Sequence, residues 1–124
     1  MGVVYLAERT TDGVVQKLAL KRMLPGFPGT PEDIARFHGE RQILASLDHP
    51  LIARLIDAGT TSDGSPYFAM EFVEGERIDR YVQLHQLSIR QRVQLVAKVA
   101  RAVGSAHRHL VVHRDLKPGN ILVD

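Results

Sequence analysis

The stretch His113-Arg114-Asp115-Leu116-Lys117-Pro118-Gly119-Asn120, close to the end of the chain, decides the interpretation of this sequence. It brings a carboxylate, an ammonium group and a side-chain amide into one short loop. A carboxylate can orient and deprotonate a hydroxyl, an ammonium can neutralise a phosphoryl oxygen, and an amide oxygen can hold Mg²⁺. The alternative is an ordinary charged surface loop, but the spacing of these groups favours chemistry on phosphate.

The segments on either side of this loop are predicted to be a helix and a strand. Ser88-Ile89-Arg90-Gln91 is a capping box that begins a long helix. Residues 89, 93, 96, 99 or 100, 103 and 107 have helical spacing, so this helix has one apolar face. Pro118 and Gly119 interrupt any continuation, and residues 121–123 begin a last strand.

The earlier part of the chain is predicted to be two hairpins with a helix between them. Strands are expected over 3–8, 14–23, 55–60 and 67–73, and the first two are joined by a turn at Asp12-Gly13. The stretch from Leu24 to Gly29 is rich in proline and glycine and continues neither element. Thr30 caps a helix that runs from Pro31 to about Leu47, and a short helix covers 78–84. We therefore predict an α+β chain whose antiparallel strands come first.

Two charged residues of this first part are candidates for chemistry. Lys21 shares a strand face with Ala19, and a small residue beside an ammonium leaves room for a flat ligand. Glu40 lies in an apolar stripe that starts at Ile34, where burying a carboxylate is costly unless it is paired. Lys21 is the nearest strong partner. The alternatives, a solvated lysine at a strand end and a glutamate tilted into water, stay open at this point.

Composition excludes several classes of protein. The 124 residues have 44% hydrophobic and 24% charged content, and the formal net charge is +2, so bulk charge does not indicate binding to nucleic acid. The absence of cysteine rules out disulfides and thiolate zinc sites. No apolar run is long enough for a membrane helix and no signal peptide is apparent. We therefore expect a cytoplasmic protein without a membrane segment.

Histidines cluster near the loop, at 107, 109 and 113. On a helix, positions 107 and 109 point about 200° apart, which does not suit shared metal ligation. No His-Glu-x-x-His pattern is present either. A histidine-based metal hydrolase is therefore the weakest of the enzymatic alternatives, and metal analysis of the purified protein would test it.

The loop resembles the catalytic loop H-R-D-L-x-x-x-N of eukaryotic-type protein kinases. Leu18-Ala19-Leu20-Lys21 is similar to the V-A-I-K strand of that family, and Glu40 is placed like the helix glutamate that pairs with its lysine. Met70-Glu71-Phe72-Val73 resembles the hinge between the lobes, and Gly2 to Ala7 resembles the end of the glycine-rich loop with its following strand. The resemblance covers the whole chain, and the run from Arg41 to Gly59 is most similar to bacterial members.

The resemblance implies ATP and Mg²⁺ as cofactors, a role for each matching residue, and a fold in which residues 1–70 are a small lobe without its first strand, 71–76 a hinge and 77–124 the start of a large lobe. Asp115 is then the catalytic base, Lys117 lies by the γ-phosphate, and Asn120 is the metal ligand. Lys21, held by Glu40, contacts the α- and β-phosphates. The Asp-Leu-Lys-Pro sequence is similar to the serine/threonine class, whose substrates are protein hydroxyls. The expected nucleotide-binding residues are Gly2, Val4, Ala19, Lys21, Met70, Glu71, Val73, Asn120 and Leu122.

The sequence departs from the family pattern at both ends. Of the glycine-rich loop only the last glycine, Gly2, is among the 124 residues, and these residues stop at Asp124 before any Asp-Phe-Gly. We therefore expect an incomplete serine/threonine kinase domain with little or no activity as an isolated chain, and an uncovered helix, 89–109, through which it associates. The alternative of a different class is a non-catalytic nucleotide-binding or regulatory module. Both interpretations require the ammonium of Lys21 and the carboxylates of Glu40 and Asp115 to converge on one nucleotide cleft.

Overall fold

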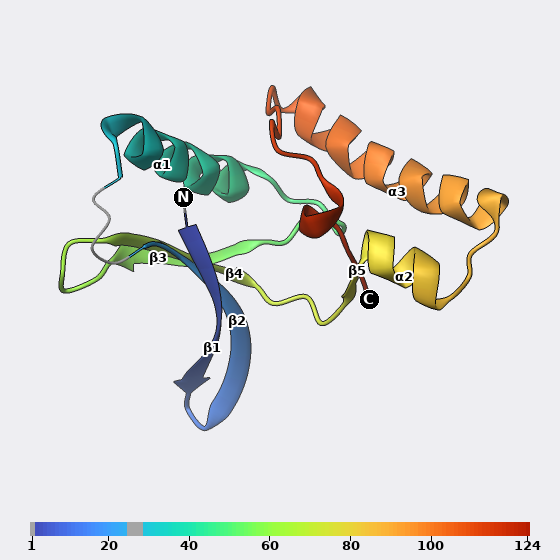
Figure 1. The fold of residues 1–124 in the computed structure, drawn as a ribbon. Coiled ribbons are helices and arrows are strands. Elements are labelled where there is room, and N and C mark those ends of the chain that lie inside the picture. The colour runs from blue at the N-terminus through green and yellow to red at the C-terminus, as the bar shows by residue number, and fades with distance from the viewer. Residues whose placement is uncertain (1, 25–28) are drawn as a thin grey trace. The chain divides into compact units, whose positions relative to one another are not determined.

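The computed structural model describes residues 2–24 and 29–124, which form two compact units (Figure 1). The first unit contains the residues up to Asp48 together with Ala53–Phe72. The second contains His49–Ile52 and Val73–Asp124. Most of the proline- and glycine-rich stretch between Leu24 and Gly29 lies outside the described residues.

The first unit contains a four-stranded antiparallel sheet with the order β1-β2-β4-β3. Its strands are β1 (Gly2–Thr11), β2 (Val14–Met23), β3 (Leu55–Thr60) and β4 (Pro66–Glu71). Asp12 and Gly13 connect β1 to β2 with φ angles of 50° and 80°. Two consecutive positive φ values give the turn whose twist matches that of paired strands, which is why Asp-Gly is a strong hairpin signal.

Helix α1 (Pro31–Ser46) packs its apolar residues on one face of this sheet. Its N-terminus has the predicted cap, because the Thr30 side chain accepts a hydrogen bond from the Asp33 amide and the Asp33 carboxylate accepts one from the Thr30 amide. Phe37 of the helix meets Phe68 of β4 with ring centroids 5.0 Å apart. These two rings and Met23 form the buried core, which is completed by partly buried Leu44, Leu55 and Met70.

The second unit contains two helices, a short 3₁₀ turn and a two-stranded ribbon. Its elements are β5 (Glu76–Arg77), α2 (Ile78–Leu84), α3 (Ile89–Arg108), η1 (Pro118–Asn120) and β6 (Leu122–Val123). β5 pairs with β6, and the chain approaches β6 so closely at Gly75 that a Cβ there would lie 2.7 Å from the Val123 carbonyl oxygen. Ser88 and Gln91 form the capping box predicted for α3.

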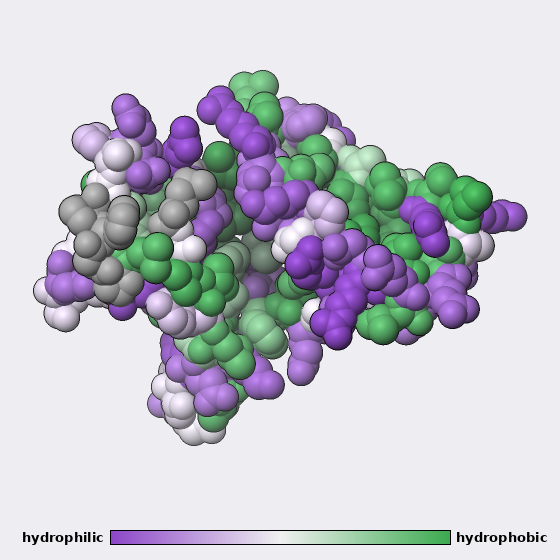
Figure 2. Space-filling model, viewed as in Figure 1, coloured by the Kyte–Doolittle hydropathy of each residue, from purple (hydrophilic) through white to green (hydrophobic). Residues whose placement is uncertain are grey.

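Helix α3 has two apolar sides, whereas the sequence predicted one. Its buried residues are the small ones Ala102, Ser105 and Ala106. The predicted stripe is exposed along the first half of the helix, because Ile89, Val93 and Val96 are 82%, 62% and 59% exposed. Figure 2 shows hydrophobic residues at the surface in the region of this helix. The expectation that this face is left uncovered is confirmed at these three residues.

The lengths of two strands and the start of the apolar stripe of α1 differ from those predicted. The first strand is longer than 3–8, because backbone pairing with β2 continues to Thr11 whatever the side chains are. The fourth strand ends at Glu71 and does not reach Val73, whose carbonyl accepts a turn bond from the Gly75 amide at 3.1 Å. Ile34, expected to start the apolar stripe of α1, is 38% exposed.

Candidate active site

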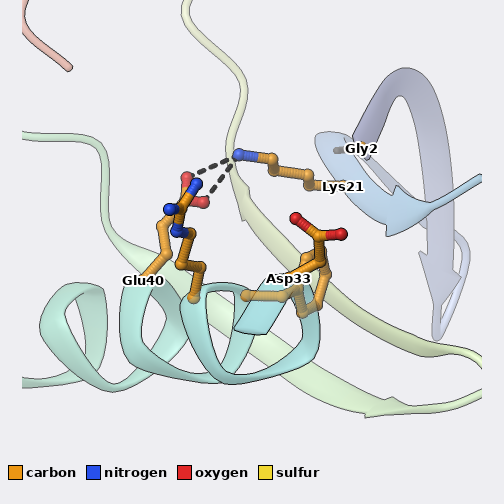
Figure 3. Close-up of a pocket in the computed structure, with 6 residues that line it drawn as sticks. Gly2, Lys21, Asp33 and Glu40 are labelled. Atoms are coloured by element: carbon orange, nitrogen blue, oxygen red, sulfur yellow. Dashed lines mark hydrogen bonds and ion pairs between the residues drawn. The ribbon is translucent and has the colours of Figure 1, made fainter. Parts of the chain in front are cut away.

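The first group of candidate residues is built around an ion pair between β2 and α1. Lys21 Nζ lies 2.7 Å from both Oε1 and Oε2 of Glu40, so the carboxylate holds the ammonium with two oxygens (Figure 3). Glu40 is therefore paired with Lys21, and the alternative of a glutamate tilted into water without a partner does not hold. The two side chains are 22% and 45% exposed, so the pair contributes about 1 kcal/mol or less to stability. The main effect of this ion pair is to fix the position of the Lys21 ammonium.

The fold supplies two reasons why the ammonium lies where it does. Lys21 stands opposite Phe68 in the pairing of β2 with β4, so both side chains point toward α1. Its Nζ is 5.9 Å from the centroid of the Phe68 ring, within the range of a cation–π contact. On α1, Phe37 and Glu40 are three residues apart and therefore lie on one face.

A small pocket adjoins this ion pair. It is lined by Gly2, Lys21, Asp33, Arg36, Phe37 and Glu40 (Figure 3). At Gly2 a Cβ would be 3.1 Å from the Arg22 carbonyl oxygen and 3.3 Å from Lys21 Cε, so glycine allows the close approach of the strand. The hydrogen bonds from Thr30 lower the pKa of Asp33, which therefore remains ionised at the pocket. Asp33 and Arg36 were missed in the sequence, although both lie at helical spacing from Glu40.

An apolar platform lies beside Lys21 on the same face of the sheet. Val4 pairs with Lys21, and Ala19 pairs with both Leu6 and Met70. Since residues directly opposite one another share a face, Val4, Ala19 and Met70 all lie on the Lys21 side. Val4 is 55% exposed, which leaves it available to a ligand. A flat apolar group placed there would lie next to the ammonium.

The expected hinge residues begin where the sheet ends. The amide of Glu71 donates to the Arg54 carbonyl at 2.8 Å, so this N–H is already used within the first unit. Val73 belongs to the second unit, as does Leu122, which is 45% exposed on β6. Their expected contacts with adenine stay predictions.

The second group of candidate residues is the loop around Asp115. Lys117 Nζ lies 3.1 Å from Asp115 Oδ2, and Asn120 Nδ2 donates to the Asp115 carbonyl oxygen at 2.8 Å and to Oδ2 at 3.2 Å. The Asp115 amide donates to His113 Nδ1 at 3.2 Å. Arg114 has a φ of 61°, which turns the chain so that these groups meet. The loop therefore brings together the carboxylate, the ammonium and the amide that the sequence places in it.

The electrostatics of this loop keep Asp115 ionised. The hydrogen bond from Lys117 has the largest effect and lowers the pKa of Asp115. Desolvation opposes it, and the bond from Asn120 lowers the pKa further, so that the net shift is downward. Because Asn120 donates through its NH₂ group, its carbonyl oxygen is left as an acceptor. Mg²⁺ takes oxygen ligands and is held in phosphate-transfer sites by one or two protein groups plus phosphates and water. The side-chain oxygen of Asn120 fits that requirement.

The part of the chain that the structure describes shows neither a cluster of metal-binding side chains nor a membrane-spanning helix. Among the described residues, no three His, Cys, Asp or Glu side chains are grouped so that they could hold a metal ion. Within residues 2–24 and 29–124, no helix has both the length and the apolar character to cross a membrane.

Comparison with known proteins agrees with this geometry. The family model of the protein kinase domain matches residues 1–124. The chain is 36% identical over 126 residues to serine/threonine-protein kinase PrkC of Bacillus subtilis, covering all of this chain and 19% of that protein. It is 35% identical to serine/threonine-protein kinase PknA of Mycobacterium tuberculosis, covering 99% and 29%. The crystal structure of the Mycobacterium tuberculosis PknI kinase domain superposes with a TM-score of 0.76 at 31% identity.

An α+β fold with a paired strand lysine and helix glutamate and a His-Arg-Asp loop defines a protein kinase. This chain belongs to the protein kinase domain family, and its matched relatives are serine/threonine kinases. The chain spans 49% of the solved PknI kinase domain and less than a third of the curated relatives named above.

Proposed function

We propose that this chain carries the nucleotide-binding and catalytic-loop residues of a serine/threonine protein kinase, which transfers the γ-phosphoryl group of ATP to protein hydroxyls. The observation that carries the proposal is the bidentate ion pair between Lys21 and Glu40. An ammonium fixed beside an apolar platform is what a nucleotide needs, with its base on the platform and its phosphates at the charge. In this proposal residues 1–70 act as the small lobe, 71–76 as the hinge and 77–124 as the start of the large lobe.

The nucleotide lies with its adenine against Val4 and Ala19 on one side and Leu122 on the other. Met70 limits the depth of the base pocket. The backbone of Glu71 and Val73 provides the polar edge that recognises the base, and the phosphates approach Gly2 and Lys21. These placements follow the family pattern, and the shared face of Val4, Ala19 and Met70 supports them within the first unit.

Asp115 accepts the proton of the substrate hydroxyl. The hydroxyl oxygen attacks the γ-phosphorus at the same time, and the bond between the γ-phosphorus and the ADP oxygen breaks. The lowered pKa keeps Asp115 ionised and able to accept at neutral pH. Lys117, 3.1 Å from Asp115, neutralises charge on the transferring phosphoryl group. Mg²⁺, when bound through the Asn120 oxygen, would supply further charge neutralisation at the phosphates.

Binding of ATP to the purified chain tests the first half of this proposal. Calorimetry should detect ATP binding that Lys21→Met weakens at least about tenfold, a change of roughly 1.4 kcal/mol. Glu40→Gln should weaken it less, because the ammonium stays but loses its anchor. Lys17→Met, on the same strand and face, is the matched control and should bind like the parent chain. Equal loss in Lys17→Met and Lys21→Met would argue against the assigned phosphate site.

Turnover tests the second half. The 124 residues contain no Asp-Phe-Gly, so we propose that this chain alone transfers little or no phosphate. Radiolabelled ATP with a serine-rich peptide should give no product above that of Asp115→Asn. Clear transfer that Asp115→Asn abolishes would show that the chain is active by itself. ATP binding without turnover is also what the alternative function, a non-catalytic nucleotide-binding module, requires.

A further inference from the structure

Arg36 lines the pocket beside the ion pair of Lys21 and Glu40. It comes four residues before Glu40 on α1, so the two side chains leave the helix on the same side. Gly2 and Lys21 line the same pocket from the strands of the sheet (Figure 3). Arg36 is thus the second cation at the place where the phosphates of a nucleotide are proposed to lie.

The two cations of this pocket differ in what already holds them. The ammonium of Lys21 is bound by both oxygens of Glu40 at 2.7 Å, so much of its charge is neutralised within the protein. Asp33, the other carboxylate of the pocket, is held by the amide and hydroxyl of Thr30, each 3.0 Å from Oδ2. Within residues 2–24 and 29–124, the guanidinium of Arg36 has no carboxylate within 4.0 Å.

A polyphosphate presents several charged oxygens in a row, and one ammonium shared with a carboxylate satisfies few of them. A guanidinium offers a planar fork of donors that matches two phosphate oxygens at once. Arg36 is exposed, so its side chain is free to turn toward a ligand without disturbing the core. Phe37, the next residue, is buried at 5% exposure and fixes this turn of the helix.

We propose that Arg36 is a second phosphate-binding residue, which contacts the polyphosphate of a nucleotide whose other phosphate contact is Lys21. The inference rests on the proposed function, since it needs a nucleotide at this pocket. It also predicts that the two cations differ in what fixes them: the protein holds Lys21 in place, whereas the bound ligand orders Arg36.

The test compares ATP with adenosine, which shares the base and ribose but has no phosphates. Calorimetry on the purified chain should show that Arg36→Ala weakens ATP binding about fivefold to tenfold and changes adenosine binding less than about twofold. Arg36→Lys should recover part of the ATP affinity, because it keeps the charge but loses the fork. Arg41→Ala is the matched control, since it removes a cation from the same helix outside the pocket. Circular dichroism melts establish that all variants fold alike.

Three results would overturn the inference, and they separate it from the proposed function. Unchanged ATP affinity in Arg36→Ala removes the contact while leaving the function standing. Equal weakening of ATP and adenosine assigns Arg36 to the structure of the helix and not to the phosphates. Absence of ATP binding by the parent chain, or ATP binding that Lys21→Met does not weaken, overturns the proposed function and this inference with it.

Discussion

The two units of this chain bury very different residues. The first unit closes two aromatic rings and a methionine between its helix and its sheet, and Phe68 is fully buried there. The second unit buries mainly small side chains along α3, while aliphatic residues of the same helix remain exposed. Burial of large apolar side chains is the main favourable term in folding. The first unit therefore has a core of large apolar side chains, whereas the second unit leaves the apolar residues Ile89, Val93 and Val96 of α3 exposed.

The largest expected effect is in the core of the first unit. Phe68→Ala should lower the free energy of unfolding by about 3–5 kcal/mol, because it removes a fully buried ring and leaves a cavity. Urea unfolding followed by circular dichroism measures the change. Val93→Ala, which shortens an exposed side chain of α3, should cost less than about 0.5 kcal/mol. Similar costs for the two variants would remove the contrast between the units.

The next effect concerns the exposed stripe of α3. We expect the isolated chain to associate through this stripe, and Val93→Asp should weaken the association at least tenfold. The helix carries five cations and no acidic residue, so copies also repel each other and added salt should strengthen the association. Analytical ultracentrifugation at low and high salt measures both effects. Val14→Asp, an exposed apolar site in the β1–β2 hairpin, is the control, and an equal effect there would point to nonspecific aggregation.

A smaller effect on stability is expected from removing the N-terminal caps of α1 and α3, and it tests whether the two units unfold separately. Thr30→Ala and Ser88→Ala each remove the side-chain acceptor at a helix N-terminus and should cost about 1 kcal/mol. If the units unfold independently, amide exchange should accelerate in α1 alone for the first variant and in α3 alone for the second. Acceleration of both helices by either variant would show that the units unfold together.

The smallest effect is the titration of the loop. Asp115 has a lowered pKa in the folded chain, so its ionised form is favoured by folding. That contribution is present above the unfolded pKa and is lost as the pH falls through the folded value. Carboxyl NMR should give a midpoint for Asp115 below its ordinary value, and Lys117→Met should raise it. Lys98→Met on α3 should leave it unchanged, and an equal rise there would exclude the Lys117 contact as the cause.

Much of the fold could be predicted from local patterns. The strands 14–23 and 55–60 and the helix 78–84 have the predicted bounds, and the predicted cap at Thr30 and capping box at Ser88 are present. Local signals decide these elements, because a cap or an Asp-Gly turn acts within a few residues. The strand Glu76–Arg77 was missed, since it exists only through pairing with Leu122–Val123 and leaves no periodic pattern in two residues.

The candidate site was predictable where motifs fix it. The pairing of Lys21 with Glu40, which the family resemblance implied, is present, and Asp115, Lys117 and Asn120 of the predicted loop contact one another. Asp33 and Arg36 could not be assigned, because their place at the pocket depends on how the strand at Gly2 approaches α1. Whether Asp115 and Lys21 act on one nucleotide stays a prediction, which the binding and turnover experiments address.

The ring of Phe68 contacts both the core and the charged pair, so a substitution there affects more than stability. One ring meets Phe37 in the core and also lies 5.9 Å from the ammonium of Lys21. A substitution of Phe68 would therefore disturb the packing of the core and the surroundings of the Lys21 ammonium together. Directed evolution of this chain for heat tolerance should find its gains elsewhere in the molecule.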